Sequence, residues 1–241
     1  MASGIWPAAA GATARMHSLD VSTTNLVNAS TPGFRAETAV FREVLAKAAL
    51  GAPSPSVVVR TTAPDMTVGQ LVSTGNKLDV AIPDKEGFFT LQTPDGPRYT
   101  RAGNFKLGGD GGLVSAEGVP VLGTDGRPIN LPPGSKDVTI DRSGTVIVDG
   151  ERQQTLAVVR FPNPDGLEKA GGVQLKARPE AGRPAAYDAT VEPGALELSN
   201  EDATAGMADE VSNSREFEMT MRVVEAFRDV ERNAANKIMN K

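Results

Sequence analysis

The stretch GFFTLQTPDGPRYTRAGNFKLGGDGGLVSAEGVPVLGTDG, residues 87–126, alternates short apolar runs with Asp-Gly pairs. The pairs begin at Asp95, Asp110 and Asp125, fifteen residues apart, and two more follow further along the chain. Asp-Gly favours the tight turns whose backbone twist matches that of paired strands. The spacing therefore predicts a meander of antiparallel hairpins, which we place in a central antiparallel β domain at residues 73–196.

Glycine and proline divide the chain into a middle and two ends. Between Gly51 and Gly194 there are 21 Gly and 15 Pro in 144 residues, whereas residues 195–241 contain no Pro and one Gly. Short strands and turns are typical of the first composition, and long helices of the second. We expect an α+β protein, mainly β, with N- and C-terminal helices. Residues 35–72 are expected to be a linker region with partial helix and strand.

Residues 1–34 predict an N-terminal helix followed by a loop. Pro7 suits the first helical turn, and Pro32-Gly33 is a stop signal. Between them the larger side chains recur in steps of 3 and 4, the heptad pattern of a helix seam. The seam is narrow and partly alanine, so the helix is weak alone. Its members are Ile5, Ala9, Ala12, Met16, Leu19, Thr23 and Leu26.

Residues 197–241 predict a C-terminal helix. Ser199, with Asp202 three residues later, matches a capping box, and the Pro-free run behind it would form a helix of about 38 residues, roughly 57 Å long. A helix of this length outgrows a small domain, so its apolar face is expected to need another chain or the other terminus. Two neighbouring stripes form that face: Phe217, Met221, Val224 and Ile238, and beside them Val223, Phe227, Val230 and Ala234.

Composition excludes several classes of protein. Leu, Ile, Val and Phe make up only about 22% of the chain, near the level at which disorder is the default, so part of the chain is expected not to fold alone. The absence of Cys excludes disulfides and thiolate chemistry, and a single His, His17, excludes His-rich metal sites. A net charge of −5 gives no support for binding nucleic acid.

The sequence predicts neither a membrane span nor a cleaved signal peptide. No stretch approaches the roughly 20 apolar residues that a span needs. The uncharged opening MASGIWPAAAGATA lacks a basic start, and Pro7 interrupts its Ala-rich core.

Residues that could suggest a catalytic or metal-binding site fit simpler structural roles better. The Asp-Gly pairs and the GGDGG run at Gly108–Gly112 match no calcium-binding loop, so turn chemistry is favoured. Asp141-Arg-Ser-Gly-Thr145 resembles an aspartic-protease loop only loosely, because Arg142 interrupts it and no second copy supplies the paired carboxylate. Another hairpin turn is therefore predicted. Asp110 and Glu117 could approach each other in a hairpin, which leaves open a secreted β-rich protein that binds or cleaves glycans.

The loop Asn28–Phe34 has two interpretations from its residues alone. Asn28 and Ser30 can bond local backbone, Pro32 forbids continuation of the helix, and Gly33 permits a turn that delivers Phe34 to a pocket. An ordinary helix stop and a contact with another subunit fit this pattern equally.

Three stretches resemble signatures of the flagellar rod and hook protein family. Thr24–Arg35, TNLVNASTPGFR, is similar to its N-terminal signature. Residues 78–107, with LDVAI and then GFFTLQTPDGPRYTRAGNFKL, are similar to the central one, and Gly194–Asn200, GALELSN, to the C-terminal one. Departures are modest: Val27 stands where Ala is common, and Pro83-Asp-Lys-Glu86 replaces a Gly-bearing turn.

The three stretches follow the family's order and span nearly the whole chain. The short length and the opening SGIW resemble a proximal rod subunit. A distal rod or hook-type axial protein of the same family stays as the alternative.

The resemblance implies a non-enzymatic structural subunit of the bacterial flagellar basal-body rod, with no cofactor and no metal. Its implied partners are other rod subunits, both self and neighbouring axial proteins, and the flagellar type III export apparatus, with no nucleic acid and no membrane insertion. Its implied location is the periplasm-spanning rod, reached without a cleaved signal peptide.

The resemblance also implies that the terminal segments are disordered in the free subunit. On assembly they would pair as a coiled coil in the inner tube, with the β domain outside. The residues expected at the subunit interface are Ile5, Met16, Leu19, Asn25, Leu26, Asn28, Thr31, Pro32, Gly33, Phe34, Phe217, Met221, Val224, Phe227 and Ile238.

Overall fold

The computed structural model of the chain describes residues 5–47, 53–132, 134–135 and 137–239. The chain divides into two compact units. We call the first the helical unit, which comprises Met1–Val27, Glu37–Ala63 and Asp202–Lys241. We call the second the β unit, which comprises Asn28–Ala36 and Pro64–Glu201.

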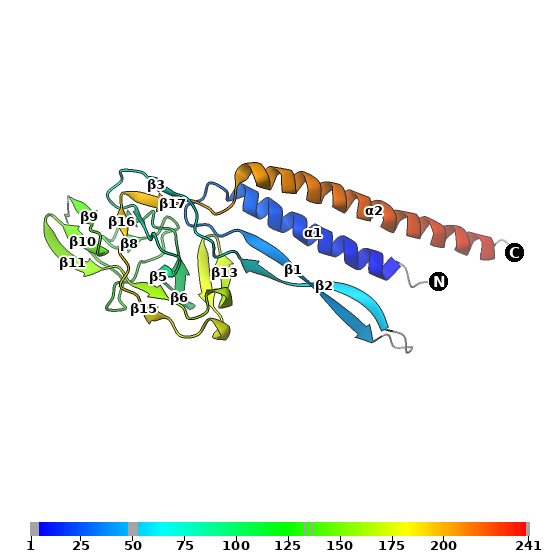
Figure 1. Cartoon of the computed structure of the whole chain (residues 1–241), viewed down its shortest axis with the longest axis horizontal. Coiled ribbons are helices and arrows are strands. Elements are labelled where there is room, and N and C mark those ends of the chain that lie inside the picture. Colours follow the sequence, from blue (N-terminus) through cyan, green and yellow to red (C-terminus); the bar gives the residue numbers. More distant parts are fainter. Residues whose placement is uncertain (1–4, 48–52, 133, 136, 240–241) are drawn as a thin grey trace. The chain divides into compact units, whose positions relative to one another are not determined.

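The helical unit contains two helices and a two-stranded sheet (Figure 1). The helices are α1 (Ile5–Val27) and α2 (Ala203–Met239), which pack side by side, and α1 also packs on β1. The sheet pairs β1 (Glu37–Lys47) with β2 (Pro53–Pro64). The partial helix expected within 35–72 is absent from the described residues of that range. The β-branched run Val57-Val-Val-Arg-Thr-Thr62 accounts for β2, because such residues favour extended backbone.

The ends of both helices differ in detail from the sequence prediction. α1 ends at Val27, before Pro32, because the following residues form a turn in which Thr31 N–H donates to the Asn28 carbonyl at 3.0 Å. α2 begins after Asp202, and Asp202 is its cap in place of Ser199. Asp202 Oδ1 accepts hydrogen bonds from Thr204 N at 2.7 Å and Ala205 N at 3.1 Å. The backbone donors at Ala205 and Thr204 lower the pKa of the Asp202 carboxyl.

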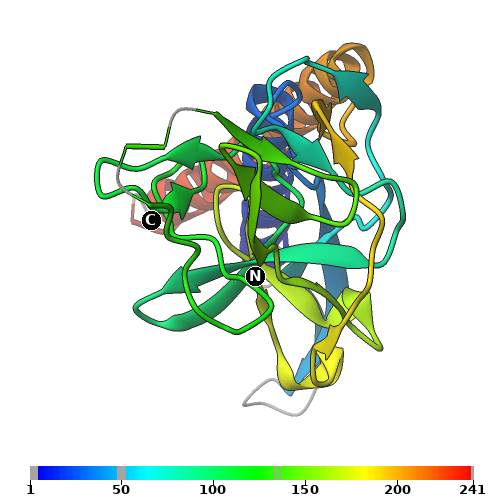
Figure 2. The same cartoon turned by 90° about the vertical axis from the view of Figure 1, so that its left-hand side faces the viewer.

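The β unit is built on a six-stranded antiparallel sheet, whose strands appear in green and yellow in Figure 2. The strand order is β13 (Leu167–Gly171), β14 (Gln174–Ala177), β6 (Gly96–Thr100), β5 (Gly87–Thr93), β12 (Val158–Arg160) and β15 (Ala185–Ala186). A second antiparallel sheet has the order β11 (Glu151–Thr155), β10 (Thr145–Val148) and β9 (Val138–Ile140). This confirms a mainly β architecture with two helices.

Three antiparallel strand pairs complete the β unit. They are β16 (Glu192–Pro193) with β4 (Val80–Ala81), β17 (Ala195–Glu197) with β3 (Leu71–Ser73), and β7 (Lys106–Leu107) with β8 (Leu113–Val114). Two short 3-10 turns, η1 (Pro164–Gly166) and η2 (Pro179–Ala181), also occur.

The Asp-Gly pairs make the turns that the sequence predicts. Pro94 and Asp95 form the β5–β6 turn, and Gly96, the first residue of β6, takes a φ of 109° that L side chains rarely adopt. Asp110 lies between β7 and β8, and Asp149 between β10 and β11. Asp165 differs, because it lies in η1 rather than in a hairpin turn.

Two apolar clusters form the core of the β unit. The larger includes Phe89, which meets Phe105 edge to face at 5.2 Å between ring centroids. The smaller is aromatic, with Tyr99 and Phe161 at 4.7 Å. Edge-to-face pairs of this kind add to the stability from burial alone. The β unit therefore has its own complete core.

Candidate functional site

Polar side chains connect the two helices. Ser22 Oγ and Thr23 Oγ1 donate to the two carboxylate oxygens of Glu210, at 2.7 and 2.9 Å. Arg15 pairs with Glu216 through its guanidinium. Because the lower-numbered residue of α1 pairs with the higher-numbered residue of α2, the helices run antiparallel here.

The predicted seam of α1 is only partly buried. Met16 is 50% exposed, and Leu19 and Leu26 are half-buried. Asn25 is instead among the buried residues, and its side-chain amide donates to the Glu37 carbonyl at 2.8 Å and accepts from Glu37 N–H at 2.9 Å. α1 therefore uses its surface on β1 as well as on α2. The side chain of Ile5 lies outside the described residues.

α2 leaves most of its apolar side chains in solvent. Val224 is buried, Phe217 is half-buried and Met221 is 36% exposed. The side chain of Ile238 lies outside the described residues. Four exposed residues recur in steps of 4, 4 and 3, which places them along one side of the helix. We call these residues the α2 stripe: Met219 (58% exposed), Val223 (49%), Phe227 (41%) and Val230 (66%).

The signature loop Asn28–Ala36 is docked within the β unit. Gly33 N–H donates to the Glu197 carbonyl at 2.7 Å, and Phe34 is 1% exposed beneath the Lys169 ammonium, which lies 3.6 Å from its ring centroid. At Gly33 φ is +68°, and a Cβ would lie 2.1 Å from Ala102 N. Only glycine fits this close approach.

A buried ionic cluster fastens this loop. Glu197 accepts from Arg101 Nε at 2.9 Å and also pairs with Arg35. The remaining Arg101 nitrogens donate to backbone carbonyls, including that of Ile82 at 3.1 Å. Gly69 N–H donates to the same Glu197 carboxylate at 2.9 Å. Burial lowers the pKa of the Arg101 guanidinium, and the Glu197 charge opposes that effect.

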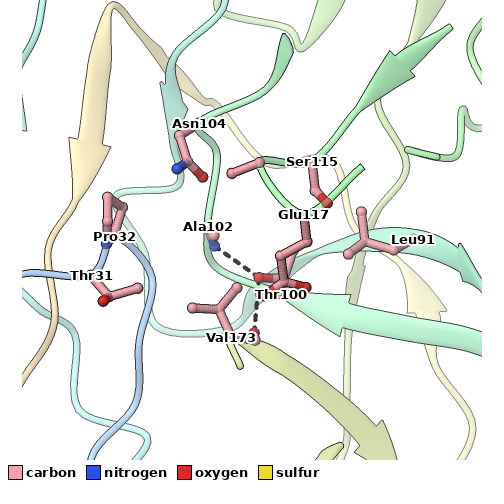
Figure 3. A pocket seen from close by; sticks show the side chains of 10 residues that line it. Thr31, Pro32, Leu91, Thr100, Ala102, Asn104, Ser115, Glu117 and Val173 are labelled. Atoms are coloured by element: carbon pink, nitrogen blue, oxygen red, sulfur yellow. Dashed lines mark hydrogen bonds between the residues drawn. The ribbon is translucent and has the colours of Figure 1, made fainter. Parts of the chain in front are cut away.

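A pocket of about 130 Å³ opens beside the loop and is lined by polar and apolar residues in equal number (Figure 3). The Thr100 hydroxyl accepts from Ala102 N–H and donates to the Val173 carbonyl, both at 3.0 Å. Its lining residues offer no histidine and no paired carboxylates, so it presents no catalytic arrangement. The lining residues are Thr31, Pro32, Leu91, Thr100, Ala102, Asn104, Ser115, Ala116, Glu117 and Val173.

The carboxylates weighed for glycan chemistry are engaged in turns and side-chain bonds. Asp110 Oδ1 accepts from Gly112 N–H at 3.1 Å, and Glu117 accepts from the Gln174 amide. Across the described part of the chain no group of three or more possible ligands could hold a metal ion. Within the same residues, neither helix is sufficiently long and apolar to span a bilayer.

Sequence reasoning and structure place the predicted loop residues differently. Gly33 and Phe34 are buried within their own β unit. Asn28, Thr31 and Pro32 are half-buried. The sequence reasoning missed the partners Arg101 and Glu197. The signal available was a carboxylate inside the apolar run Ala195–Leu198, since a buried charge needs a partner.

Comparison with known proteins gives consistent matches. Residues 84–148 match the family described as "Flagellar hook protein FlgE/F/G D1 domain". The flagellar basal-body rod protein FlgF of Salmonella typhimurium is 35% identical over 250 residues, which cover 98% of each chain. FlgF of Escherichia coli is 35% identical over 240 residues, 93% of this chain and 94% of that protein. FlgG of Bacillus subtilis is 29% identical over 232 residues, 86% of this chain and 88% of that protein.

Proposed function

Because this chain belongs to the flagellar basal-body rod protein family, as a structural subunit of the bacterial rod, we propose that it joins the rod through its terminal helices. The observation that carries this proposal is the α2 stripe. Four large apolar side chains on one side of a 37-residue helix remain 41–66% exposed in the single chain. Exposed apolar surface of this extent is typical of a surface that another chain covers.

The polar contact between α1 and α2 supports the same proposal. Glu210 is held by Ser22 and Thr23, so this part of the helix pair is fixed without using the α2 stripe. Burying a large apolar side chain contributes about 1.5 to 3 kcal/mol. Ordering each backbone residue costs about 1 to 2 kcal/mol. We therefore infer that the helix pair is only marginally stable in the free subunit and that neighbouring subunits complete its order on assembly, as a coiled coil.

We propose that other rod subunits cover the α2 stripe, either copies of this chain or adjacent axial proteins. A position in the proximal rod is favoured by the match to Salmonella typhimurium FlgF, which covers 98% of each chain. Export through the flagellar type III apparatus without a cleaved signal belongs to the same proposal. So does a non-enzymatic role, since the relatives are named as rod proteins.

The test is a charge placed in the α2 stripe. Phe227→Asp should abolish incorporation into basal bodies in a host whose own copy of the gene is replaced. The matched control is Asn236→Asp, because Asn236 is exposed and lies nine residues on, about half a turn around the helix. The control adds the same charge and should incorporate normally.

A second readout separates assembly from folding. The thermal unfolding of the β unit should be the same in both variants, because Phe227 belongs to the helical unit. Normal incorporation of Phe227→Asp would overturn the proposal that the α2 stripe is a subunit interface.

A further inference from the structure

Asn200 lies where the chain leaves the β unit. By sequence the chain leaves this unit after Ala36 and after Glu201, and it re-enters the unit at Pro64. We call these three boundary points the exits. Asn200 Oδ1 accepts from Ala36 N–H at 2.7 Å. Its Nδ2 donates to the Asp65 carbonyl at 3.0 Å. Asp65 N–H in turn donates to the Ala36 carbonyl at 2.7 Å, so the exits are joined to each other within the β unit.

One side chain makes these contacts across long sequence separations. Ala36 and Asp65 are 164 and 135 residues from Asn200. Nδ2 also reaches the Thr67 carbonyl at 3.2 Å and its hydroxyl at 3.1 Å. A carboxamide both accepts and donates, whereas a carboxylate only accepts and a methyl group does neither. A charged or an apolar side chain in place of Asn200 would therefore lose at least part of this set of hydrogen bonds.

Asn200 is distinct from the buried core of its unit. It is half-buried, whereas Glu197, three residues earlier, is 1% exposed and fastens the signature loop. The bonds of Asn200 run to exit segments and not to the two apolar clusters. Removing them is therefore expected to free the exits and leave the sheets intact.

The helical unit gathers its own entry points in a similar way. Asn25 bonds both the N–H and the carbonyl of Glu37, the first residue of β1. Thr62, near the end of β2, donates to the Glu37 carboxylate at 2.8 Å. Each unit thus uses an asparagine to tie a place where the chain crosses its boundary.

We propose that Asn200 is a positioning residue for rod assembly: it holds the exits at Ala36, Asp65 and Glu201 in one place. The segments that connect to β1, β2 and α2 then begin at points that are held in place within the β unit. This inference rests on the proposed function, because fixed exits matter where the α2 stripe must meet other subunits. In this role Asn200 acts through the backbone that it holds.

The first test is amide hydrogen exchange on the full chain. In Asn200→Ala the Ala36 amide should exchange about tenfold faster, as expected for the loss of a hydrogen bond at a local opening. Asn200→Asp keeps an acceptor, so it should return the Ala36 amide to within about twofold of wild type. The same variant loses the donor to the Asp65 and Thr67 carbonyls, so this segment should open more often, and the Asp65 N–H, which donates to the Ala36 carbonyl, should still exchange about tenfold faster than in wild type.

The amide of Val121 is the internal control, since it donates to the Leu113 carbonyl at 2.9 Å in the core. Its exchange should not change in either variant. An unaltered Ala36 amide in Asn200→Ala would overturn the proposal. Equal acceleration at Val121 would also overturn it, because Asn200 would then be part of the core.

The second test is incorporation into basal bodies. Asn200→Ala should reduce incorporation at least severalfold while the melting temperature of the β unit is unchanged. Wild-type incorporation together with a fast Ala36 amide would overturn the positioning role. Phe227→Asp should lose incorporation with a normal Ala36 amide. If Phe227→Asp incorporates normally instead, the proposed function fails, and the exchange result for Asn200 still separates the two ideas.

Discussion

The helical unit and the β unit distribute polar and apolar side chains in opposite ways. In the β unit Phe89 and Leu91 are fully buried, and even the charged Glu197 and Arg101 are at most 1% exposed. On α2, Met219 and Val230 are 58% and 66% exposed. The helix pair instead bonds through hydroxyls, carboxylates and a guanidinium. The β unit buries its large apolar side chains in its own core, whereas the helical unit leaves large apolar side chains exposed on α2.

A substitution that leaves a cavity in the core should show the largest difference in stability between the two units. Phe89→Ala removes a fully buried ring that contacts Phe105, so we expect the free energy of unfolding of the β unit to fall by about 3 to 5 kcal/mol. Phe227→Ala, at a ring 41% exposed, should change the unfolding free energy of the isolated chain by less than about 0.5 kcal/mol. Urea unfolding of both variants measures the difference. Similar losses would contradict the contrast in burial.

The ionic cluster provides the second comparison. Glu197→Gln keeps the shape of the side chain but leaves Arg35 and Arg101 buried without their counter-charge. Removing one partner of such a cluster costs about 3 kcal/mol, because the remaining charges stay desolvated. The matched control is Glu168→Gln, whose ion pair with Arg178 is partly exposed and is worth at most about 1 kcal/mol. Urea unfolding should rank them in that order, and equal values would show that solvent reaches Glu197.

Elements with a strong local pattern were predictable from sequence. The Asp95-Gly96 turn and the Pro-free run of α2 each depend on residues close together in the chain. The cap of α2 was misassigned by three residues because Ser199 and Asp202 both have suitable side chains. Only the backbone geometry decides which of the two accepts from the first helical amides.

Contacts between distant residues were beyond sequence reasoning. Arg101 and Glu197 are 96 residues apart, and nothing in the spacing of either pairs them. The loop pattern predicts that Phe34 enters a pocket, and the structure buries Phe34 within its own β unit. The identity of a partner surface depends on the folded chain, which a local pattern does not describe.

The polar contact of the helix pair gives a smaller effect. Glu210→Ala removes the acceptor for Ser22 and Thr23, so the helical unit should lose about 1 to 2 kcal/mol of stability. Glu218→Ala, at an exposed position of the same helix, is the control and should lose less than about 0.5 kcal/mol. Helical circular dichroism during thermal unfolding measures both. A loss for Glu210→Ala no greater than the control would mean that apolar contacts fix the pair instead.

The smallest effect concerns the first turn of α2, and it depends on pH. Hydrogen bonds from the Ala205 and Thr204 amides lower the pKa of the Asp202 carboxyl in the folded chain below its ordinary value of 3.8. A lowered folded-state pKa means that the carboxylate stabilises the helix at every pH above about 3.8. That contribution is lost as the pH falls from there through the lower folded value.

Asp202→Asn separates this carboxylate from every other acid in the helical unit. Asparagine caps helices as well as aspartate does, yet it does not titrate. Wild type and Asp202→Asn should therefore have similar α2 helicity at pH 4 and diverge as the pH is lowered to 2, because only the wild type loses the contribution of its cap. Parallel pH profiles would show that Asp202 keeps the same proton affinity in the folded and unfolded chain. The first turn would then owe its stability to backbone contacts alone.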